Sequence, residues 1–139
     1  MFIKSIVNIF AVLLFTTLAA SAVYAKELPV SPIYTPDTIQ APAGMTAEEV
    51  RKAVRKAMFL KDWQILDVDS GNVQGKFRKL DKNGEKYRIV VNIKHDAKGV
   101  RISYQDSAGL NHSDGLIHST YGNRVKDLEK TIRAELGAF

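Results

Sequence analysis

The sequence predicts an α+β domain in which a helix, a four-stranded antiparallel meander sheet and a second helix follow one another, with both helices packed on one face of the sheet. Two segments carry apolar residues at helical spacing, one around residue 50 and one near the carboxyl terminus. Four short runs separated by turn signals lie between them. Because the connections are short, neighbouring strands must be antiparallel, and one sheet face can cover both helices.

The first predicted helix spans Ala47–Leu60. Thr46 and Glu49 have the spacing of a capping box, in which the threonine side chain accepts from the Glu49 amide and the glutamate reaches back. The apolar residues that follow at helical spacing are Val50, Ala53, Val54, Ala57 and Met58. Since cations occupy the opposite side, the pattern indicates an amphipathic helix with one buried face.

Four strands are expected, over residues 63–68, 73–80, 85–94 and 100–105. Asn83 and Gly84 form a strong hairpin signal between the second and third strands. The third strand is the longest and alternates strictly, with Tyr87, Ile89, Val91 and Ile93 on one side. Such alternation predicts a sheet with one face in the core and the other in water.

The second helix is expected to begin near Leu116 and to end before Gly137, a residue type that commonly stops helices. Its apolar stripe is the cleanest in the chain and comprises Ile117, Tyr121, Val125, Leu128, Ile132 and Leu136. We therefore expect this stripe and Trp63 to be buried between the helices and the sheet.

The amino-terminal residues have the layout of a secretory signal peptide. Lys4 precedes an apolar run over residues 6–20, and small residues lead to an A-x-A-like cleavage site ending at Ala25, with cleavage after Ala22 as the alternative. The sequence therefore predicts a periplasmic or secreted protein. No residue from 5 to 25 is charged, so an uncleaved signal would be a plausible membrane anchor.

The expected organisation is a signal peptide over residues 1–25, a Pro-rich extended arm over 26–45 and a single α+β domain over 46–139. The arm holds all four prolines, Pro29, Pro32, Pro36 and Pro42. Proline fixes φ and removes a backbone donor, which argues against helix or central strand. The arm is either extended or a disordered leader, and its apolar residues either lie against the domain or are offered to a partner. We expect its deletion to leave the fold intact.

Composition excludes several classes of site. The chain has no cysteine, which excludes disulfides, thiolate catalysis, Cys-ligated metals and the lipidated cysteine of a lipoprotein. After removal of residues 1–25, nineteen Lys and Arg face fifteen Asp and Glu, a net charge of +4. No second apolar run approaches the roughly 20 residues needed to span a bilayer.

The predicted register places a basic surface on the water-facing side of the sheet. Its cations, the candidate anion-binding residues, are Lys76, Arg78, Lys86, Arg88, Lys94 and Arg101, and the register puts no acidic residue among them. Such a surface could hold phosphates of a lipid headgroup or another polyanion. It lacks the exposed aromatics that single-strand binders use, which argues against nucleic acid. The same cations would also serve solubility and block aggregation between sheets.

Catalytic and metal-binding patterns are weak. The three histidines, His95, His112 and His118, show no H-x-x-x-H spacing, and no G-x-S-x-G motif is present. We therefore assign no catalytic residue, no metal and no cofactor. The alternative is a small hydrolase or metal-dependent enzyme built on His118, which would need Ser107 or Ser113 and an aspartate close by.

Short motifs near the carboxyl terminus resemble those of a family of small bacterial exported proteins and lipoproteins of uncharacterised function. The family pattern runs Y-x-D-S-x-x-L and then I-H-x-x-Y-N-x-W-[VI]-x-x-L. The chain matches it at Tyr104, Asp106, Ser107, Leu110, Ile117, His118, Tyr121 and Leu128, and departs from it at Gly122 and Arg124. The resemblance covers residues 49–132. It implies an exported protein with this fold and names no activity.

The matched residues are candidate site residues, namely Tyr104, Asp106, Ser107, His118 and Tyr121. A structural role would account for two of these matches, because Tyr121 lies on the buried stripe and His118 can hydrogen-bond the loop that contains Ser107. The sequence as a whole favours a non-enzymatic exported domain whose partner is an envelope protein or an anionic envelope component.

Overall fold

The computed structural model describes residues 29–138, so the predicted signal peptide lies outside the described residues. The helices are α1 (Ala47–Leu60) and α2 (Thr120–Leu136). The strands are β1 (Val30–Pro32), β2 (Ile39–Gln40), β3 (Gln64–Asp69), β4 (Asn72–Asp81), β5 (Gly84–His95), β6 (Gly99–Ala108) and β7 (Leu116–His118). Between residues 29 and 138, neither helix has the length and apolar character needed to cross a membrane.

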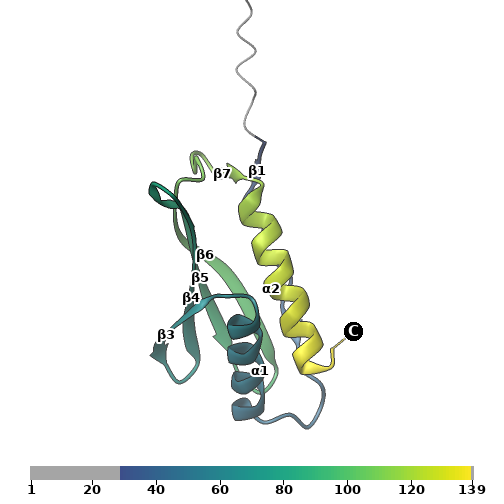
Figure 1. Cartoon of the computed structure of the whole chain (residues 1–139). Coiled ribbons are helices and arrows are strands. Elements are labelled where there is room, and N and C mark those ends of the chain that lie inside the picture. The colour runs from purple at the N-terminus through teal and green to yellow at the C-terminus, as the bar shows by residue number, and fades with distance from the viewer. Residues whose placement is uncertain (1–28, 139) are drawn as a thin grey trace, which may run out of the picture.

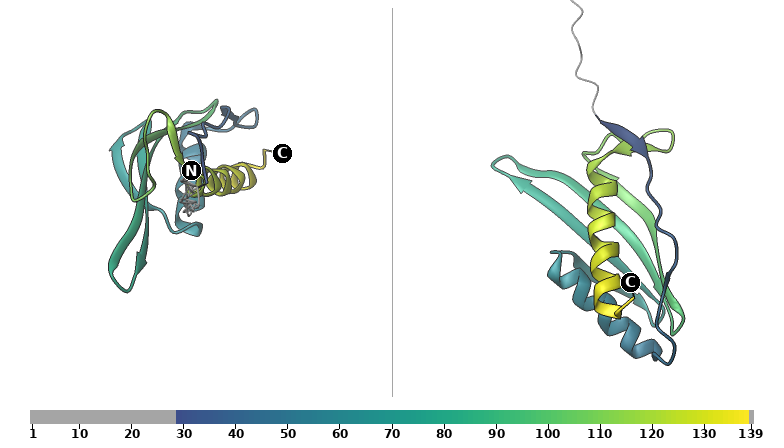
Figure 2. Two further views of the ribbon diagram at one scale, coloured as in Figure 1. Left: turned by 90° about the horizontal axis from the view of Figure 1, so that it is seen from above. Right: turned by 90° about the vertical axis from the view of Figure 1, so that its right-hand side faces the viewer.

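The α+β architecture is confirmed, with two antiparallel sheets. The larger sheet has the strand order β2-β6-β5-β4-β3, so β3 to β6 form the expected meander and β2 adds a fifth strand at one edge. A separate two-stranded sheet pairs β1 with β7. Both helices cover one face of the large sheet and leave its other face open, here called the outer face (Figures 1 and 2).

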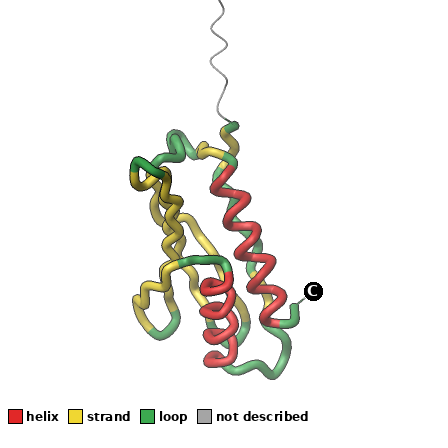
Figure 3. The backbone as a smooth tube through the Cα atoms, viewed as in Figure 1, coloured by secondary structure: helices red, strands yellow, loops and turns green. Residues whose placement is uncertain are grey.

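The buried core takes apolar side chains from both helices and from the sheet. Figure 3 shows the two helices on the same side of the strands. The capping box is confirmed, because the Glu49 amide donates to Thr46 Oγ1 at 3.1 Å and the Thr46 amide donates to Glu49 Oε2 at 2.9 Å. Trp63 and Leu128 are both buried, as the sequence predicts. The ring of Trp63 also packs against that of Phe77, with centroids 5.6 Å apart, which fixes the α1–β3 connection over the sheet.

The Pro-rich arm is ordered from residue 29 onward and lies against the domain, so the disordered alternative is wrong for that part. Its β2 residue Ile39 pairs with Val100 and is fully buried in the core. Tyr34 donates to Glu129 Oε2 of α2 at 2.6 Å, and this bond raises the pKa of the tyrosine to about 12. Such packing does not support the expectation that the arm can be deleted without loss.

The second helix begins later than predicted, at Thr120 rather than near Leu116. Residues 116–118 form β7 because β1 pairs with them, and the Ser119 amide donates to the Pro29 carbonyl at 2.8 Å. Ile117 is buried as expected, but from a strand. The His118 side chain therefore lies just before α2, and its Nδ1 accepts from the Thr120 amide at 3.1 Å.

Candidate anion-binding pocket

Two β-bulges change the charge of the outer face. One is in β5, where Lys86 is the extra residue opposite the step from Lys79 to Leu80. The other is in β6, where Gln105 is the extra residue opposite the step from Val90 to Val91. Side chains alternate with a period of two, so one extra residue moves its neighbours to the opposite face. Glu85 then pairs with Leu80, and Asp106 with Val90, on the outer face. The expectation that this face carries no acidic residue is therefore wrong.

These two carboxylates neutralise the middle of the predicted basic surface. Arg88 lies 3.0 Å from Glu85 Oε1 and 3.6 Å from Asp106 Oδ2, and Arg78 lies 3.8 Å from Glu85 Oε2. Lys76 projects from β4 beside this cluster, and Lys86 is the extra residue of the first bulge. The six candidate cations therefore do not form one uniform surface.

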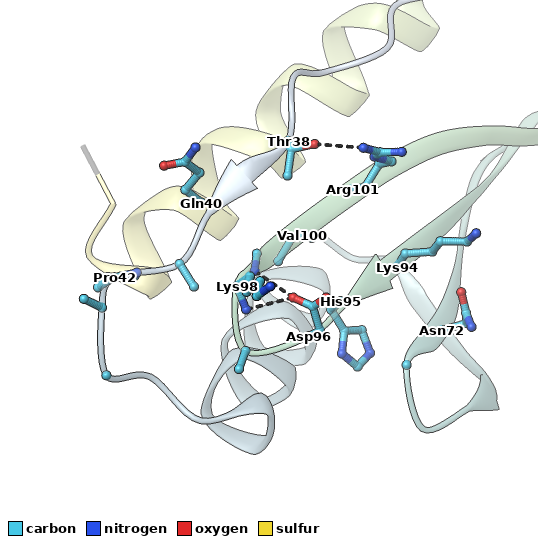
Figure 4. Close-up of a pocket in the computed structure, with 16 residues that line it drawn as sticks. Thr38, Gln40, Pro42, Asn72, Lys94, His95, Asp96, Lys98, Val100 and Arg101 are labelled. Atoms are coloured by element: carbon cyan, nitrogen blue, oxygen red, sulfur yellow. Dashed lines mark hydrogen bonds between the residues drawn. The ribbon is translucent and has the colours of Figure 1, made fainter.

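The remaining two candidates, Lys94 and Arg101, lie directly opposite each other on β5 and β6 at the other end of the outer face. They border a hollow of about 870 Å³, which Lys98 of the β5–β6 turn also lines (Figure 4). Within residues 29–138, none of these three cations is ion-paired to a carboxylate. We call Lys94, Lys98 and Arg101, with the hollow between them, the cationic pocket.

Backbone contacts fix the walls of the cationic pocket. Asp96 Oδ1 accepts from the Lys98 amide at 2.8 Å and from the Gly99 amide at 3.1 Å, so this carboxylate holds the turn. The Ala41 amide of the arm donates to the Lys98 carbonyl at 2.8 Å. Figure 4 shows Arg101 pointing toward Thr38 of the arm, with Nη2 3.5 Å from Oγ1. The arm and the turn, which carry these contacts, therefore both border the hollow that Lys98 and Arg101 line.

His95 lines the same hollow and is buried. Burial lowers its pKa, and the nearby guanidinium groups of Arg51 and Arg55 on α1 act in the same direction. Asp69 and Asp96 oppose this shift with the smaller effect, so the net pKa lies below the usual 6.5. A neutral His95 leaves the positive charge of the pocket to Lys94, Lys98 and Arg101.

We expect the free energy of unfolding to fall as the pH is lowered from about 7.5 to about 5, in part because of His95. The unfolded chain takes up this proton near pH 6.5 while the folded chain resists it, so acid favours unfolding. Urea denaturation across this range should show a shallower fall in His95→Gln than in the unchanged chain. An identical pH dependence in both chains would contradict the burial of His95.

The residues of the family-like motif fall into two places. Tyr104 links Ser107 and His112, because its hydroxyl lies 2.9 Å from Ser107 Oγ and 3.1 Å from His112 Nδ1. Asp106 faces the outer side and contacts Arg88. Ser107 lies in β6, and the His118 backbone amide donates to the Leu110 carbonyl in the loop after that strand, at 2.8 Å. The His118 ring accepts from the Thr120 amide at the start of α2.

This arrangement does not assemble the hydrolase set considered from the sequence. Ser107 is hydrogen-bonded to Tyr104, and the His118 ring is bonded to the Thr120 amide. No hydrogen bond joins either side chain to a carboxylate in the described part of the chain. Residues 29–138 also contain no cluster of three or more His, Asp or Glu side chains that could hold a metal ion.

Tyr121 is fully buried, and its hydroxyl has no hydrogen-bond partner among the described residues. Burial raises the pKa of this phenol. A buried polar group without a partner costs about 1–3 kcal/mol. We therefore expect Tyr121→Phe to raise the free energy of unfolding by about 1–3 kcal/mol, as measured by urea denaturation.

Tyr104→Phe is the matched control, since its hydroxyl contacts both Ser107 and His112 and its ring packs edge-on against that of Tyr121. Loss of these bonds should lower stability by roughly 0.5–1.5 kcal/mol. Destabilisation by Tyr121→Phe would show instead that its hydroxyl makes a favourable contact in solution.

Sequence reasoning missed Thr38 and Lys98 as pocket residues. Lys98 lies in a turn between two strands that carry candidate cations, and that position is the available signal. Thr38 gives no local signal, because its place depends on the pairing of β2 with β6 across about half the chain.

No protein-family model and no curated protein matches the chain. Functional assignment therefore depends on the chemistry of the residues described above.

Proposed function

We propose that this protein is a non-enzymatic exported domain that binds an anionic envelope component through its cationic pocket. The observation that carries the proposal is the position of Lys94, Lys98 and Arg101 around one hollow without a carboxylate partner in residues 29–138. An arginine fork and two lysine ammonium groups suit phosphate or carboxylate oxygens. The signal-like residues 1–25 and the resemblance to exported bacterial proteins support the compartment.

The pattern of ion pairs distinguishes these three residues from the arginines in the middle of the outer face. Several other cations contact carboxylates, such as Arg55 with Asp67 and Lys61 with Asp127. Arg78 and Arg88 likewise share Glu85. Three cations and one carboxylate, that of Asp96, line the hollow, so its net charge is positive and an anion would relieve the repulsion among the cations. The pocket is therefore a stronger candidate than the middle of the outer face.

Binding of inorganic polyphosphate, measured by isothermal titration calorimetry, tests the proposal. We expect the paired reversal Lys94→Glu and Arg101→Glu to weaken binding at least about tenfold, which corresponds to about 1.4 kcal/mol. Binding should also weaken as salt rises from about 0.1 M to about 1 M, because exposed charges are screened.

The matched control is Lys52→Glu with Lys130→Glu, which makes the same charge change on exposed helix positions. Equal loss in the control and the pocket variant would show a response to net charge alone and contradict the proposal. Failure of the unchanged chain to bind polyphosphate at low salt would contradict it as well. Export is checked separately, since mass spectrometry of the exported protein should show Lys26 as the first residue.

A further inference from the structure

Three of the large apolar residues that are exposed between residues 29 and 138 lie at the end of the domain opposite the cationic pocket, while Phe59, Leu60 and Val68 are exposed elsewhere. Leu80 at the β4–β5 hairpin is 59% exposed, Leu116 of β7 is 42% exposed and Val30 of β1 is 47% exposed. Figures 1 and 2 show the β4–β5 turn and the β1–β7 pair at the upper end of the molecule, whereas the β5–β6 turn and residues 41–45 lie at the lower end. We call this upper end, with Leu80, Leu116 and Val30, the apolar end.

Three lysines without ion pairs in residues 29–138 lie near Leu80 in the β4–β5 hairpin. Lys79, Lys82 and Lys86 are all exposed, and none of them is ion-paired within the described residues. The two acids of the same hairpin are already engaged, because Asp81 Oδ1 accepts from the Asn83 amide at 2.7 Å and Glu85 contacts Arg88 at 3.0 Å. The hairpin therefore offers an apolar side chain surrounded by three free positive charges.

We propose that the apolar end lies against the surface of an anionic lipid bilayer. Exposed apolar side chains flanked by lysines suit the boundary between acyl chains and acidic headgroups. The cationic pocket lies at the other end of the domain and therefore faces away from the bilayer (Figures 1 and 2).

The chain has no cysteine, so single cysteines can be introduced for labelling without background. The experiment uses the exported form of the protein, residues 26–139, mixed with vesicles, with an environment-sensitive fluorophore at Leu80→Cys, Leu116→Cys or Ala97→Cys. Ala97 lies in the β5–β6 turn and is exposed, so it reports on the opposite end. The vesicles contain either phosphatidylcholine alone or equal parts of phosphatidylcholine and phosphatidylglycerol.

We expect the labels at positions 80 and 116 to shift their emission to the blue on the phosphatidylglycerol vesicles and to be quenched by lipid-attached quenchers. The label at position 97 should do neither. The shift should be smaller on phosphatidylcholine alone, since the lysines would then lack an anionic surface. Labels at 80 and 116 that stay as water-exposed as the label at 97 would overturn the proposal.

A second set of variants separates headgroup contact at the hairpin from an effect of net charge. Reversal of the hairpin lysines by Lys79→Glu, Lys82→Glu and Lys86→Glu should abolish most of the blue shift at position 116. Lys52→Glu, Lys56→Glu and Lys130→Glu together make the same charge change at exposed helix positions and should leave that shift in place. An equal loss in both triple variants would overturn the assignment of the surface to the apolar end.

Discussion

Replacement of Ile39 by alanine should lower the free energy of unfolding by about 2–5 kcal/mol. Ile39 is fully buried, although it belongs to a two-residue strand in a segment rich in proline. Its side chain completes the core at the edge where β2 pairs with β6, so truncation leaves a cavity. A side chain at Gly99 would also collide with the Ile39 carbonyl, which shows how closely the two strands approach.

Val30→Ala is the matched control, since Val30 lies in the same arm but is 47% exposed. We expect it to change stability by no more than about 0.5 kcal/mol. Urea denaturation followed by tryptophan fluorescence suits both variants, because Trp63 is the single tryptophan. A loss below about 0.5 kcal/mol in Ile39→Ala would mean that the arm leaves the domain in solution, as the sequence interpretation allowed.

Local periodicity was sufficient to predict the two helices and the four strands of the meander. The capping box at Thr46 and the alternation from Tyr87 to Ile93 depend on residues close in sequence, so they can be read without a partner. The short strands β1 and β2 cannot be predicted from the local sequence, because each has three residues or fewer and pairs with a distant segment. The late start of α2 has the same cause, since β7 exists only through its pairing with β1.

The candidate site was predictable in part. Alternation placed Lys94 and Arg101 on the outer face, and their pairing across β5 and β6 agrees with that expectation. The bulges had no clear local signal, because Lys86 and Gln105 are ordinary strand residues. A one-residue bulge is nonetheless enough to bring Glu85 to Arg88 and thereby remove the middle of the predicted basic surface. The face on which a charged strand residue lies can therefore be predicted only when the register of the strand is known.

Replacement of Leu128 by alanine is the second substitution with a large expected effect, a loss of about 2–5 kcal/mol in the free energy of unfolding. Leu128 is fully buried on α2, in the stripe that also contains Val125 and Ile132. The two helices pack against each other and share the sheet beneath them, so the truncation leaves a cavity inside the core. The cost depends on how far the surrounding side chains can collapse into the space.

Lys130→Ala serves as the control on the same helix, because Lys130 is exposed and alanine favours helix at least as well. Its stability should stay within about 0.5 kcal/mol of the unchanged chain. If Leu128→Ala also stayed within that range, the stripe would have to be accessible in solution, and α2 would then be a surface for a partner. A large loss in Leu128→Ala with none in Lys130→Ala instead assigns the stripe to the core, which leaves the cationic pocket and the apolar end as the surfaces proposed for binding.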